Sequence, residues 1–395
     1  MSKFNRRGLL TGSTAAAGAA GLFRGHDVFA KLTVDIEPRG QRGIFERLPD
    51  LNLESYHDFL RGFRQWSNFY GLASACRERA LVLCKDAGLD AMDVTKLSFE
   101  QLLTLVDKDP TINLYGRAWL DGQYFKFKTL QDAFHARADE YFSEMEAADN
   151  EGPGKLELNP KMFIPDYTKH EIHTQLGGYV GDPFAGYIYV YDILILNDGA
   201  NEQEVNQKAT AAAVPLPKDG KVKRILDYGT GPGQLAVALQ NRFPEAEVWG
   251  IDVGGPMVRY AHMHANDIGS KANFRQSLAE DNGFPDNYFD IICTNIVHHE
   301  VTAEASKQIF KEVHRSLRPG GVYYPTDTYL GTGSPKDAFG RFVRYLDQRW
   351  NHEDWTLEWM DMDRIGAMKA AGLKMEENGP ASRPGASANP VGIKA

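Results

Sequence analysis

Residues 224–234 read RILDYGTGPGQ, and this stretch decides the fold. Its first four residues are predicted to form a short strand around Ile225 and Leu226, and residues 234–241 are predicted to form a helix. The three glycines between them stand at alternate positions, which lets the backbone turn sharply and approach a ligand closely. The helix that follows offers unpaired N–H groups at its start. The stretch therefore predicts a ligand-binding turn between a strand and a helix.

The chain downstream of this turn alternates strands with helices. We expect strands over residues 247–252, 274–276, 289–295 and 322–327, and helices over residues 256–267 and 303–316. The segment 289–295 is almost entirely apolar, which is typical of a strand buried on both faces. This alternation predicts an α/β fold, in which a parallel sheet carries helices on both faces.

An acidic residue at the end of the second strand limits the classes of ligand that the loop could bind. Asp252 follows the last loop glycine by nineteen residues, and a carboxylate at that place can accept both hydroxyls of a ribose. A nicotinamide fingerprint would place glycine at position 234, where this chain has Gln234. A Walker loop would end in Gly-Lys-Ser/Thr, which is absent. The pairing of the loop with Asp252 therefore indicates a nucleoside ligand of another kind.

The loop resembles the D-x-G-x-G-x-G segment of class I S-adenosylmethionine-dependent methyltransferases. The resemblance runs from about residue 221 to the C-terminus and includes Asp252, the stretch 279–290 and the Leu-Arg-Pro-Gly-Gly segment 317–321. It implies a Rossmann-like sheet of parallel strands that ends in an antiparallel pair, over residues 373–377 and 391–394. It also implies S-adenosyl-L-methionine as the cofactor.

The resemblance assigns roles to individual residues. Asp227 and the loop would hold the amino-carboxyl end of the methionine, and Asp252 the ribose. Val253 would pack on the adenine, and Leu278, which stands where the family usually has Asp, would contact its rim with the two residues after it. The cofactor-binding residues implied in this way are Asp227, Gly229, Thr230, Gly231, Gly233, Asp252, Val253, Leu278, Ala279, Glu280 and, beside the sulfonium, Asn295.

Polar residues that could serve the methyl acceptor lie in three places. A His-His-Glu run follows the fourth strand at the carboxyl edge of the sheet, where ligands bind in open α/β folds. Such a histidine can act as a base, or it can only pack and orient a loop. The candidate catalytic residues are His298, His299 and Glu300, and the candidate substrate residues are His173, Tyr179 and His352. No fixed ligand spacing supports a metal site from His298, His299, Glu300 and His352, so none is predicted.

The sequence divides into five predicted segments. Residues 1–30 resemble a twin-arginine export signal, with Arg6 and Arg7 before a weakly apolar run; a flexible tail is the alternative. This signal predicts transit through the twin-arginine translocase and a periplasmic location, or a cytoplasmic one if it is not used. The segments that follow are a linker over 31–50, a helical domain over 51–150, an aromatic-rich connector or flap over 151–220 and the methyltransferase domain over 221–395.

No family resemblance is identified for the helical domain. Its aromatic residues between 56 and 70 recur at spacings of three and four, and we expect them to form its core, with a few lining a substrate pocket. We expect a short helix ending before Pro110 and another from about 130 to 148. In the connector, His173 and Tyr179 belong to a segment that either covers the cofactor and acceptor or joins two domains. Substrate choice is placed in the helical domain by analogy alone.

Composition excludes several classes of partner. The chain has 395 residues and a formal net charge of −9, which disfavours a nucleic-acid partner because a phosphate backbone requires a basic surface. No run of 18 apolar residues is present, so no ordinary membrane-spanning helix is expected. Cys76 and Cys84 lie eight residues apart on one predicted helix, about 12 Å along its axis, which is too far for a disulfide.

These observations favour one function over another. The leading hypothesis is an enzyme that transfers a methyl group from S-adenosyl-L-methionine to a small, aromatic or partly apolar molecule. The alternative is a non-catalytic binding or assembly protein that retains the methyltransferase fold. Alignment of acceptor, methyl group and sulfur can supply much of the rate, and a base is needed only for an acceptor that keeps its proton. The oligomeric state and the acceptor atom are not predicted.

Overall fold

The computed structural model describes residues 40–90, 98–196, 201–328, 330, 338–383 and 385–395. The predicted export signal and residues 31–39 of the predicted linker lie outside these ranges, so the signal stays a prediction. Within the ranges, none of the helices combines the length and the hydropathy needed to cross a membrane.

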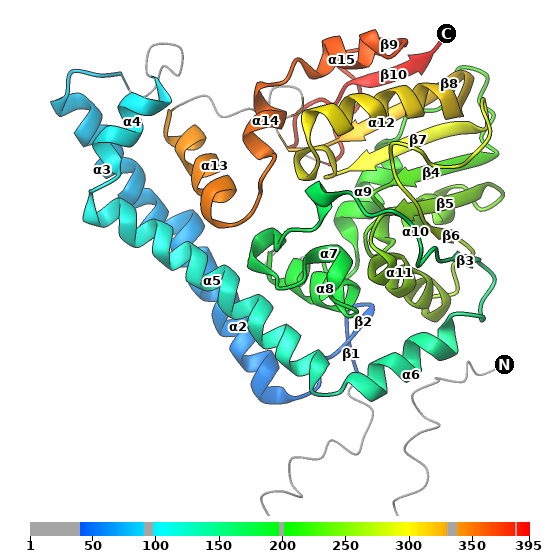
Figure 1. Ribbon diagram of the computed structural model, residues 1–395, viewed down its shortest axis with the longest axis horizontal. Helices are drawn as coiled ribbons and strands as arrows, with labels where there is room; N and C mark the ends of the chain where they lie inside the picture. Colours follow the sequence, from blue (N-terminus) through cyan, green and yellow to red (C-terminus); the bar gives the residue numbers. More distant parts are fainter. Residues whose placement is uncertain (1–39, 91–97, 197–200, 329, 331–337, 384) are drawn as a thin grey trace, which may run out of the picture.

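Eight strands of the described chain form one mixed sheet in the order β3-β6-β5-β4-β7-β8-β10-β9 (Figure 1). The strands are β3 (Leu156–Glu157), β4 (Arg224–Tyr228), β5 (Glu247–Asp252), β6 (Asn273–Gln276), β7 (Phe289–Asn295), β8 (Leu317–Thr326), β9 (Leu373–Glu376) and β10 (Val391–Lys394). Strands β3 to β8 pair in parallel, whereas β10 runs antiparallel to both β8 and β9. The predicted α/β fold with a closing antiparallel pair is confirmed.

The alternation of side chains along β4 separates two cores. Ile225 and Leu226 are both fully buried, but they point to opposite faces of the sheet. Helices α9 (Val205–Ala213), α10 (Gln234–Arg242) and α11 (Gly255–Asp267) cover the face of Ile225. Helices α12 (Ala303–Ser316) and α15 (Arg364–Ala370) cover the face of Leu226. The loops at the carboxyl ends of the central strands therefore lie between two packed layers, which hold them in place.

Strand β8 starts earlier than expected. The Leu-Arg-Pro-Gly-Gly segment 317–321 was expected to precede the strand, yet Leu317 already pairs with Phe289 of β7. The ladder then shifts register before Ile291 pairs with Val322. Such a bulge accommodates the glycines and the proline without ending the strand.

The helical region forms an arm that extends away from the sheet (Figure 1). Its elements are α2 (Leu51–Gln65), the π-helical turn η2 (Trp66–Tyr70), α3 (Leu72–Asp86), α4 (Phe99–Val106), α5 (Pro110–His135) and α6 (Ala138–Ala148). The predicted short helix that ends before Pro110 is confirmed by α4. The expected helix start near residue 130 is wrong, because α5 runs through 26 residues from Pro110 to His135 and α6 begins only at Ala138. Pro110 occupies the first turn of α5, where its missing N–H costs nothing, and the Asp109 carboxylate caps this turn.

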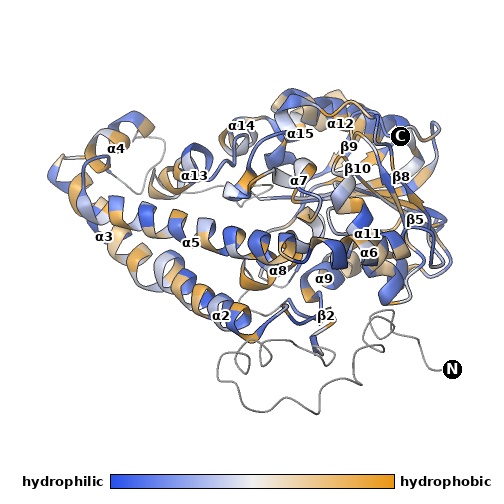
Figure 2. Ribbon diagram, turned by 60° about the horizontal axis from the view of Figure 1, so that its bottom comes forward, coloured by the Kyte–Doolittle hydropathy of each residue, from blue (hydrophilic) through white to orange (hydrophobic). Residues whose placement is uncertain are grey.

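Several aromatic residues of the arm are not in its core. Phe59, Trp66, Phe69 and Tyr70 expose between 49% and 74% of their surface, whereas Leu60 on the opposite side of α2 is 3% exposed. Figure 2 shows hydrophobic positions recurring along α2 and α5 as well as in the sheet domain. The π-helical turn changes the helical period at this point, so the regular spacing in the sequence does not continue along one buried face.

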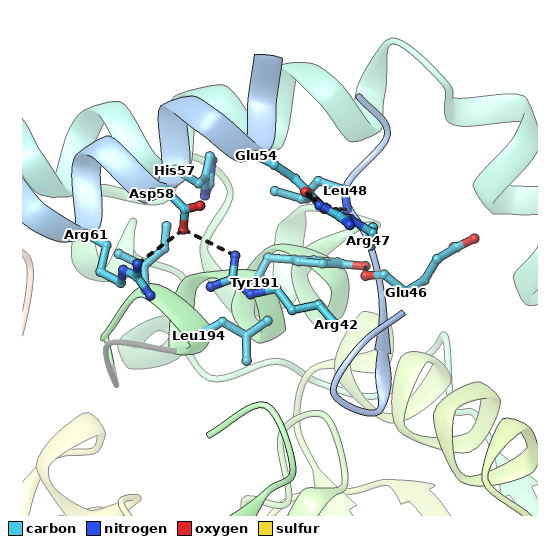
Figure 3. A pocket seen from close by; sticks show the side chains of 11 residues that line it. Arg42, Glu46, Arg47, Leu48, Glu54, His57, Asp58, Arg61, Tyr191 and Leu194 are labelled. Carbon is cyan, nitrogen blue, oxygen red and sulfur yellow. Dashed lines mark hydrogen bonds and ion pairs between the residues drawn. The ribbon is translucent and has the colours of Figure 1, made fainter. Parts of the chain in front are cut away.

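Residues 40–50 are packed against the protein and do not form a free linker. They contain the strands β1 (Gln41–Arg42) and β2 (Phe45–Glu46), and Phe45 and Leu48 are buried. Figure 3 shows this segment beside α2 and Tyr191, with an ion pair between Arg47 and the Glu54 carboxylate. Tyr191 also donates to the carbonyl oxygen of Glu46 at 2.6 Å. This segment has only two buried apolar side chains and no periodicity, so its packing could not be predicted from the sequence.

A connector and two late helices join the arm to the sheet. The connector consists of short turns η3 (Asp166–Thr168) and η4 (Ile172–Thr174) and helices α7 (Gly178–Gly181) and α8 (Ala185–Leu196). Helices α13 (Ala338–Trp350) and α14 (Thr356–Asp361) follow β8, and α13 lies between the arm and the sheet (Figure 1). Phe339 and Phe342 of α13 are buried in the hydrophobic core of the arm. The arm is therefore packed against the C-terminal region as well as its own helices.

Candidate functional site

The glycine loop takes the conformation that its sequence predicts. Gly229, Gly231 and Gly233 have φ angles of 60°, 52° and 83°, which other residues rarely adopt. A Cβ atom on Gly229 would lie 2.6 Å from the Val297 side chain. A Cβ atom on Gly233 would lie 2.7 Å from Ala261, so this glycine allows α10 to approach α11. Gly229 and Gly231 line a cavity that is described below, whereas Gly233 does not line it and allows two helices to pack closely.

Two carboxylates flank the loop. Asp252 accepts the N–H groups of Gly231 at 2.9 Å and of Gly254 at 2.8 Å, one on each carboxylate oxygen. Asp227 accepts the hydroxyl of Thr230 at 2.7 Å. Burial raises the pKa of Asp227 to about 7 and also raises the pKa of Asp252. Each oxygen of Asp252 keeps a lone pair, so the carboxylate can hold the loop and accept hydroxyl groups of a ligand together.

A cavity of about 580 Å³ opens beside this loop, within the range of small-molecule sites. It collects most of the sequence-predicted residues. Those that line it are Asp227, Gly229, Thr230, Gly231, Asp252, Val253, Leu278, Ala279, Glu280, Asn295, His299, Glu300, His173 and Tyr179. Gly233, His298 and His352 do not line it.

The connector covers the cofactor side of the cavity. The Tyr167 hydroxyl donates to the Glu280 carboxylate, and the indole N–H of Trp355 donates to the Tyr167 carbonyl at 3.3 Å. The carbonyl of Tyr179 lies so close to Gly254 that a Cβ atom there would meet it at 2.8 Å. The connector thus reaches directly over the loop that follows Asp252, which fits its expected place as a flap.

The helical arm and α13 form the remaining wall. From the arm come Phe69, Tyr115, Trp119 and Lys126, and from α13 comes Phe339. Phe69, Tyr115, Trp119 and Phe339 form the aromatic part of this wall, and Arg64, Asn68, Gln123, Arg344 and Asp347 add polar and charged side chains to it. The arm therefore contributes directly to the surface that a bound molecule would meet.

A buried ion pair lies in this wall. Lys126 on α5 pairs with Asp192 on α8, and both side chains are almost completely buried. Burial lowers the pKa of Lys126. Sequence reasoning missed both residues, because the two helices are far apart in the chain and neither residue belongs to a motif.

His299 forms an ion pair with Asp327, a residue that sequence reasoning also missed. His299 Nδ1 lies 2.6 Å from Asp327, whose other oxygen accepts the N–H of His298 at 2.6 Å. Burial alone would lower the pKa of His299, but Asp327 and Glu300 outweigh it and raise this pKa well above its ordinary value. Both ring nitrogens of His299 face carboxylates, Asp327 at Nδ1 and Glu300 at Nε2, and this arrangement favours the protonated ring.

Glu300 and Glu353 form an acidic end of the cavity together with His173. His173 Nε2 lies 3.2 Å from Glu353 and 3.9 Å from Glu300. Burial, followed by the charge of Glu300, raises the pKa of Glu353 well above its ordinary value. Burial would also raise the pKa of Glu300, but His299 outweighs it and the pKa is lowered.

Of the neighbouring pair His352 and Glu353, which the sequence offers as polar pocket groups, Glu353 lines the cavity and the candidate substrate residue His352 does not. His352 has a φ of 57° and points to solvent. The turn at His352 instead directs its two neighbours, Asn351 and Glu353, into the cavity. The Asn351 amide nitrogen contacts His173 Nδ1 at 3.0 Å. The signal was present as the Asn-His-Glu run, but the side of the turn that faces inward could not be read from it.

His298 lies behind the site in the protein core. Its ring stacks on Trp359 with centroids 5.0 Å apart, and its two nitrogens contact Ser306 Oγ at 3.1 Å and the Tyr323 hydroxyl at 2.8 Å. Burial lowers the pKa of His298 to about 4. The structure thus places this candidate catalytic residue in a packing role, since all of its polar atoms have partners inside the fold.

Replacing His298 with alanine should therefore cost stability and spare the ligand site. We expect the free energy of unfolding to fall by about 2–4 kcal/mol, because a buried ring is lost and two hydroxyls lose partners. Urea unfolding measures this loss. The affinity for the ligand of the glycine loop should stay within about twofold, and a tenfold loss in folded protein would show that His298 does reach the site.

Comparison with known proteins finds a methyltransferase-domain match over the part of the chain that contains the glycine loop. Residues 225–321 match a family model described as a methyltransferase domain. The chain is 36% identical over 141 residues to a demethylmenaquinone methyltransferase of Thermus thermophilus, which covers 35% of this chain and 60% of that protein. It is 31% identical over 107 residues to a ubiquinone biosynthesis O-methyltransferase of Pseudomonas syringae pv. tomato, which covers 26% of this chain and 44% of that protein.

A solved structure shows a related but partial match. The YcgJ protein of Bacillus subtilis is 26% identical, with a TM-score of 0.35, over 43% of this chain and 69% of that chain. The chain spans 60% and 44% of the lengths of the two curated relatives described above, which is less than two thirds of either. The matched family segment begins in β4 and ends in β8, so the arm, the connector and α13 lie outside it.

Proposed function

We propose that this protein is an S-adenosylmethionine-dependent methyltransferase that acts on a small, aromatic or partly apolar molecule. One observation carries the proposal. The glycine loop and Asp252 open into a cavity of about 580 Å³ whose other walls come from the connector, the arm and α13. The methyltransferase-domain match over residues 225–321 supports the reaction class.

The residues present fit the cofactor. The left-handed glycines leave room for a ligand to approach the backbone, and a side chain on Gly229 would clash with Val297. Asp227 and Thr230 would hold the amino-carboxyl end, and the free lone pairs of Asp252 would accept the ribose hydroxyls. Val253 and the 278–280 segment, all on the cavity wall, would contact the adenine.

Bound S-adenosylmethionine supplies an electrophilic methyl group on a sulfonium. The chain's own contribution is alignment and exclusion of water, which can be worth up to about 7–11 kcal/mol. The Tyr167–Glu280 and Trp355–Tyr167 contacts keep the connector over the cofactor side. Glu300 and Glu353 form the end at which a polar group of the acceptor would lie.

The aromatic side chains in the cavity wall support the proposal of an aromatic or partly apolar acceptor. Tyr115, Trp119 and Phe339 are largely buried yet line the cavity, so a flat ring can pack against them. Two relatives of the matched domain are named for demethylmenaquinone and for ubiquinone biosynthesis, and both names refer to quinones. A quinone precursor or another phenol-like ring is therefore the first class of acceptor to test.

The test is transfer of labelled methyl from S-adenosylmethionine to a panel of phenols, quinols and aromatic amines. We expect product with at least one of these classes and none with the Asp252→Ala variant. Cofactor binding without transfer to any acceptor, including a small-molecule extract, would favour the non-catalytic alternative.

Trp119→Leu tests the place of the acceptor. Trp119 lies on α5 and is 8% exposed. Loss of its ring should raise KM for an aromatic acceptor by about tenfold, because roughly 1–1.5 kcal/mol of aromatic contact is removed. Cofactor affinity should not change. The matched control is Leu114→Ala on the same helix, at a position that is 56% exposed. Equal KM values for all three proteins would place the acceptor elsewhere.

A further inference from the structure

The acidic end of the cavity carries a ligand set for a cation. We infer that His173, Glu300 and Glu353 bind a divalent transition-metal ion such as Zn²⁺. Each of the three offers one ligand atom, and these atoms all lie within 4.8 Å of one another. They come from three segments distant in sequence, namely η4, the turn after β7 and the loop after α13, and the fold brings them to one point.

The spacing of the ligand atoms suits such an ion. With metal–ligand bonds of about 2.0–2.2 Å and tetrahedral angles, neighbouring ligand atoms lie about 3.3–3.6 Å apart. His173 Nε2 and Glu353 Oε1 are 3.2 Å apart, which is close to this range. His173 Nε2 and Glu300 Oε1 are 3.9 Å apart, so a rotation of the Glu300 side chain completes the set.

Two buried atoms of residues that line the cavity lack hydrogen-bond partners within the described protein. Glu300 Oε2 has no hydrogen-bond partner, although it is shielded from solvent. His170 Nε2 is in the same state, and His170 lines the same cavity. His170 Nδ1 donates to the Tyr167 carbonyl at 3.0 Å, which leaves the lone pair of Nε2 free in the neutral ring. A ring held in this way by a carbonyl is the usual arrangement of a metal-binding histidine.

Further groups orient the proposed ligands from behind. His299 Nε2 lies 3.4 Å from Glu300, and the Thr356 hydroxyl lies 3.4 Å from Glu353. Asn351 Nδ2 donates to His173 Nδ1, which places the ring proton on Nε2. An ion on Nε2 therefore requires this amide to flip and to exchange its contacts with Asp347 and Gln123. A set of one imidazole and two carboxylates favours a transition-metal ion over Ca²⁺ or Mg²⁺, which prefer oxygen ligands.

The ion would lie in the cavity that also contains Asp252 and Asn295. If the proposed methyl transfer holds, the ion would bind the acceptor oxygen and lower its pKa, which removes the need for a side-chain base. The acceptor class would then be a phenol or a vicinal diol. Metal binding itself does not depend on the methyltransferase proposal.

The test is calorimetric titration of Zn²⁺ into tag-free, chelator-treated full-length protein. We expect one ion per chain with micromolar or tighter affinity. Glu353→Gln keeps the shape of the side chain, and His173→Asn suits the φ of 55° at this position because asparagine tolerates it. Each variant should weaken Zn²⁺ binding by at least about 30-fold, equivalent to about 2 kcal/mol. Co²⁺ absorption should report the same loss of coordination.

Two controls separate this proposal from the previous one. Glu304→Gln removes a carboxylate that is 69% exposed at the start of α12, and it should bind Zn²⁺ like the unmodified chain. Asp252→Ala should keep Zn²⁺ affinity while losing S-adenosylmethionine. Folded protein that binds no Zn²⁺ below millimolar concentration, or variants that bind as well as the unmodified chain, would overturn the metal site and leave the cofactor proposal intact.

Discussion

Replacing Asp252 with alanine should weaken binding of S-adenosylmethionine by about 100-fold or more. The carboxylate would accept two ribose hydroxyls, and hydrogen bonds to a charged group contribute about 1.5–3 kcal/mol each. Loss of both corresponds to two or more powers of ten in Kd. The variant also loses the contacts from the Gly231 and Gly254 N–H groups, which hold the glycine loop. Calorimetric titration measures the affinity.

Two further variants test whether the loss of affinity is specific to the charge at position 252. Asp252→Asn keeps the shape of the side chain and should retain part of the loop contacts, so it should fold like the unmodified protein and still lose most of the affinity. Asp281→Ala removes an exposed carboxylate on the loop after β6 and should change nothing. An Asp252→Ala protein that is folded and binds the cofactor as tightly as before would contradict the assignment of the ribose site.

Replacing Asp227 with asparagine should stabilise the cofactor-free protein at high pH. The unfolded carboxyl titrates near 3.8, whereas burial raises the pKa of Asp227 to about 7 in the folded protein. Ionising the folded form therefore costs free energy. Because each pKa unit is worth about 1.4 kcal/mol, the full cost is on the order of 4 kcal/mol. Asparagine keeps a neutral side chain and does not carry this cost.

The pH dependence follows from the same pKa values. The contribution of Asp227 to stability is complete below pH about 4 and is lost as pH rises to about 7. The stability difference between Asp227→Asn and the unmodified chain should therefore grow over this interval and stay constant at higher pH. Urea unfolding at pH 5, 6, 7 and 8 measures it, with Asp281→Asn as the exposed control. A difference that does not vary with pH would show that Asp227 is not a raised-pKa carboxyl.

The sheet could be predicted from the sequence because its signals are local. The apolar run of β7 and the glycine loop after β4 each determine their own backbone, and both elements lie where expected. The arm was harder to predict. Helix α5 continues through Gly116 and Gly122, which read as weak points, because packing against α2, α3 and α8 holds it together. Tertiary packing of this kind leaves no mark in a short window of sequence.

The residues on the cofactor side of the site could also be predicted from the sequence, whereas those on the acceptor side could be predicted only in part. For most residues of the glycine loop, the residue type and the spacing are enough to predict the role. Asp327 and Glu353 are single acidic residues without a motif, and only the turns after β8 and α13 bring them to His299 and His173. His298 and His299 are neighbours in sequence, yet one lies in the core and the other on the cavity. Which of two adjacent residues faces inward depends on the backbone of the short turn that holds them.

The central claim is that the cavity binds S-adenosylmethionine. Calorimetric titration of the unmodified full-length chain with S-adenosylmethionine, and in parallel with NAD⁺, tests it most directly. The account predicts one bound S-adenosylmethionine per chain and no binding of NAD⁺, since Gln234 occupies the place of the third fingerprint glycine. Folded protein that gives no binding of S-adenosylmethionine would contradict the account and leave the glycine loop as a structural turn.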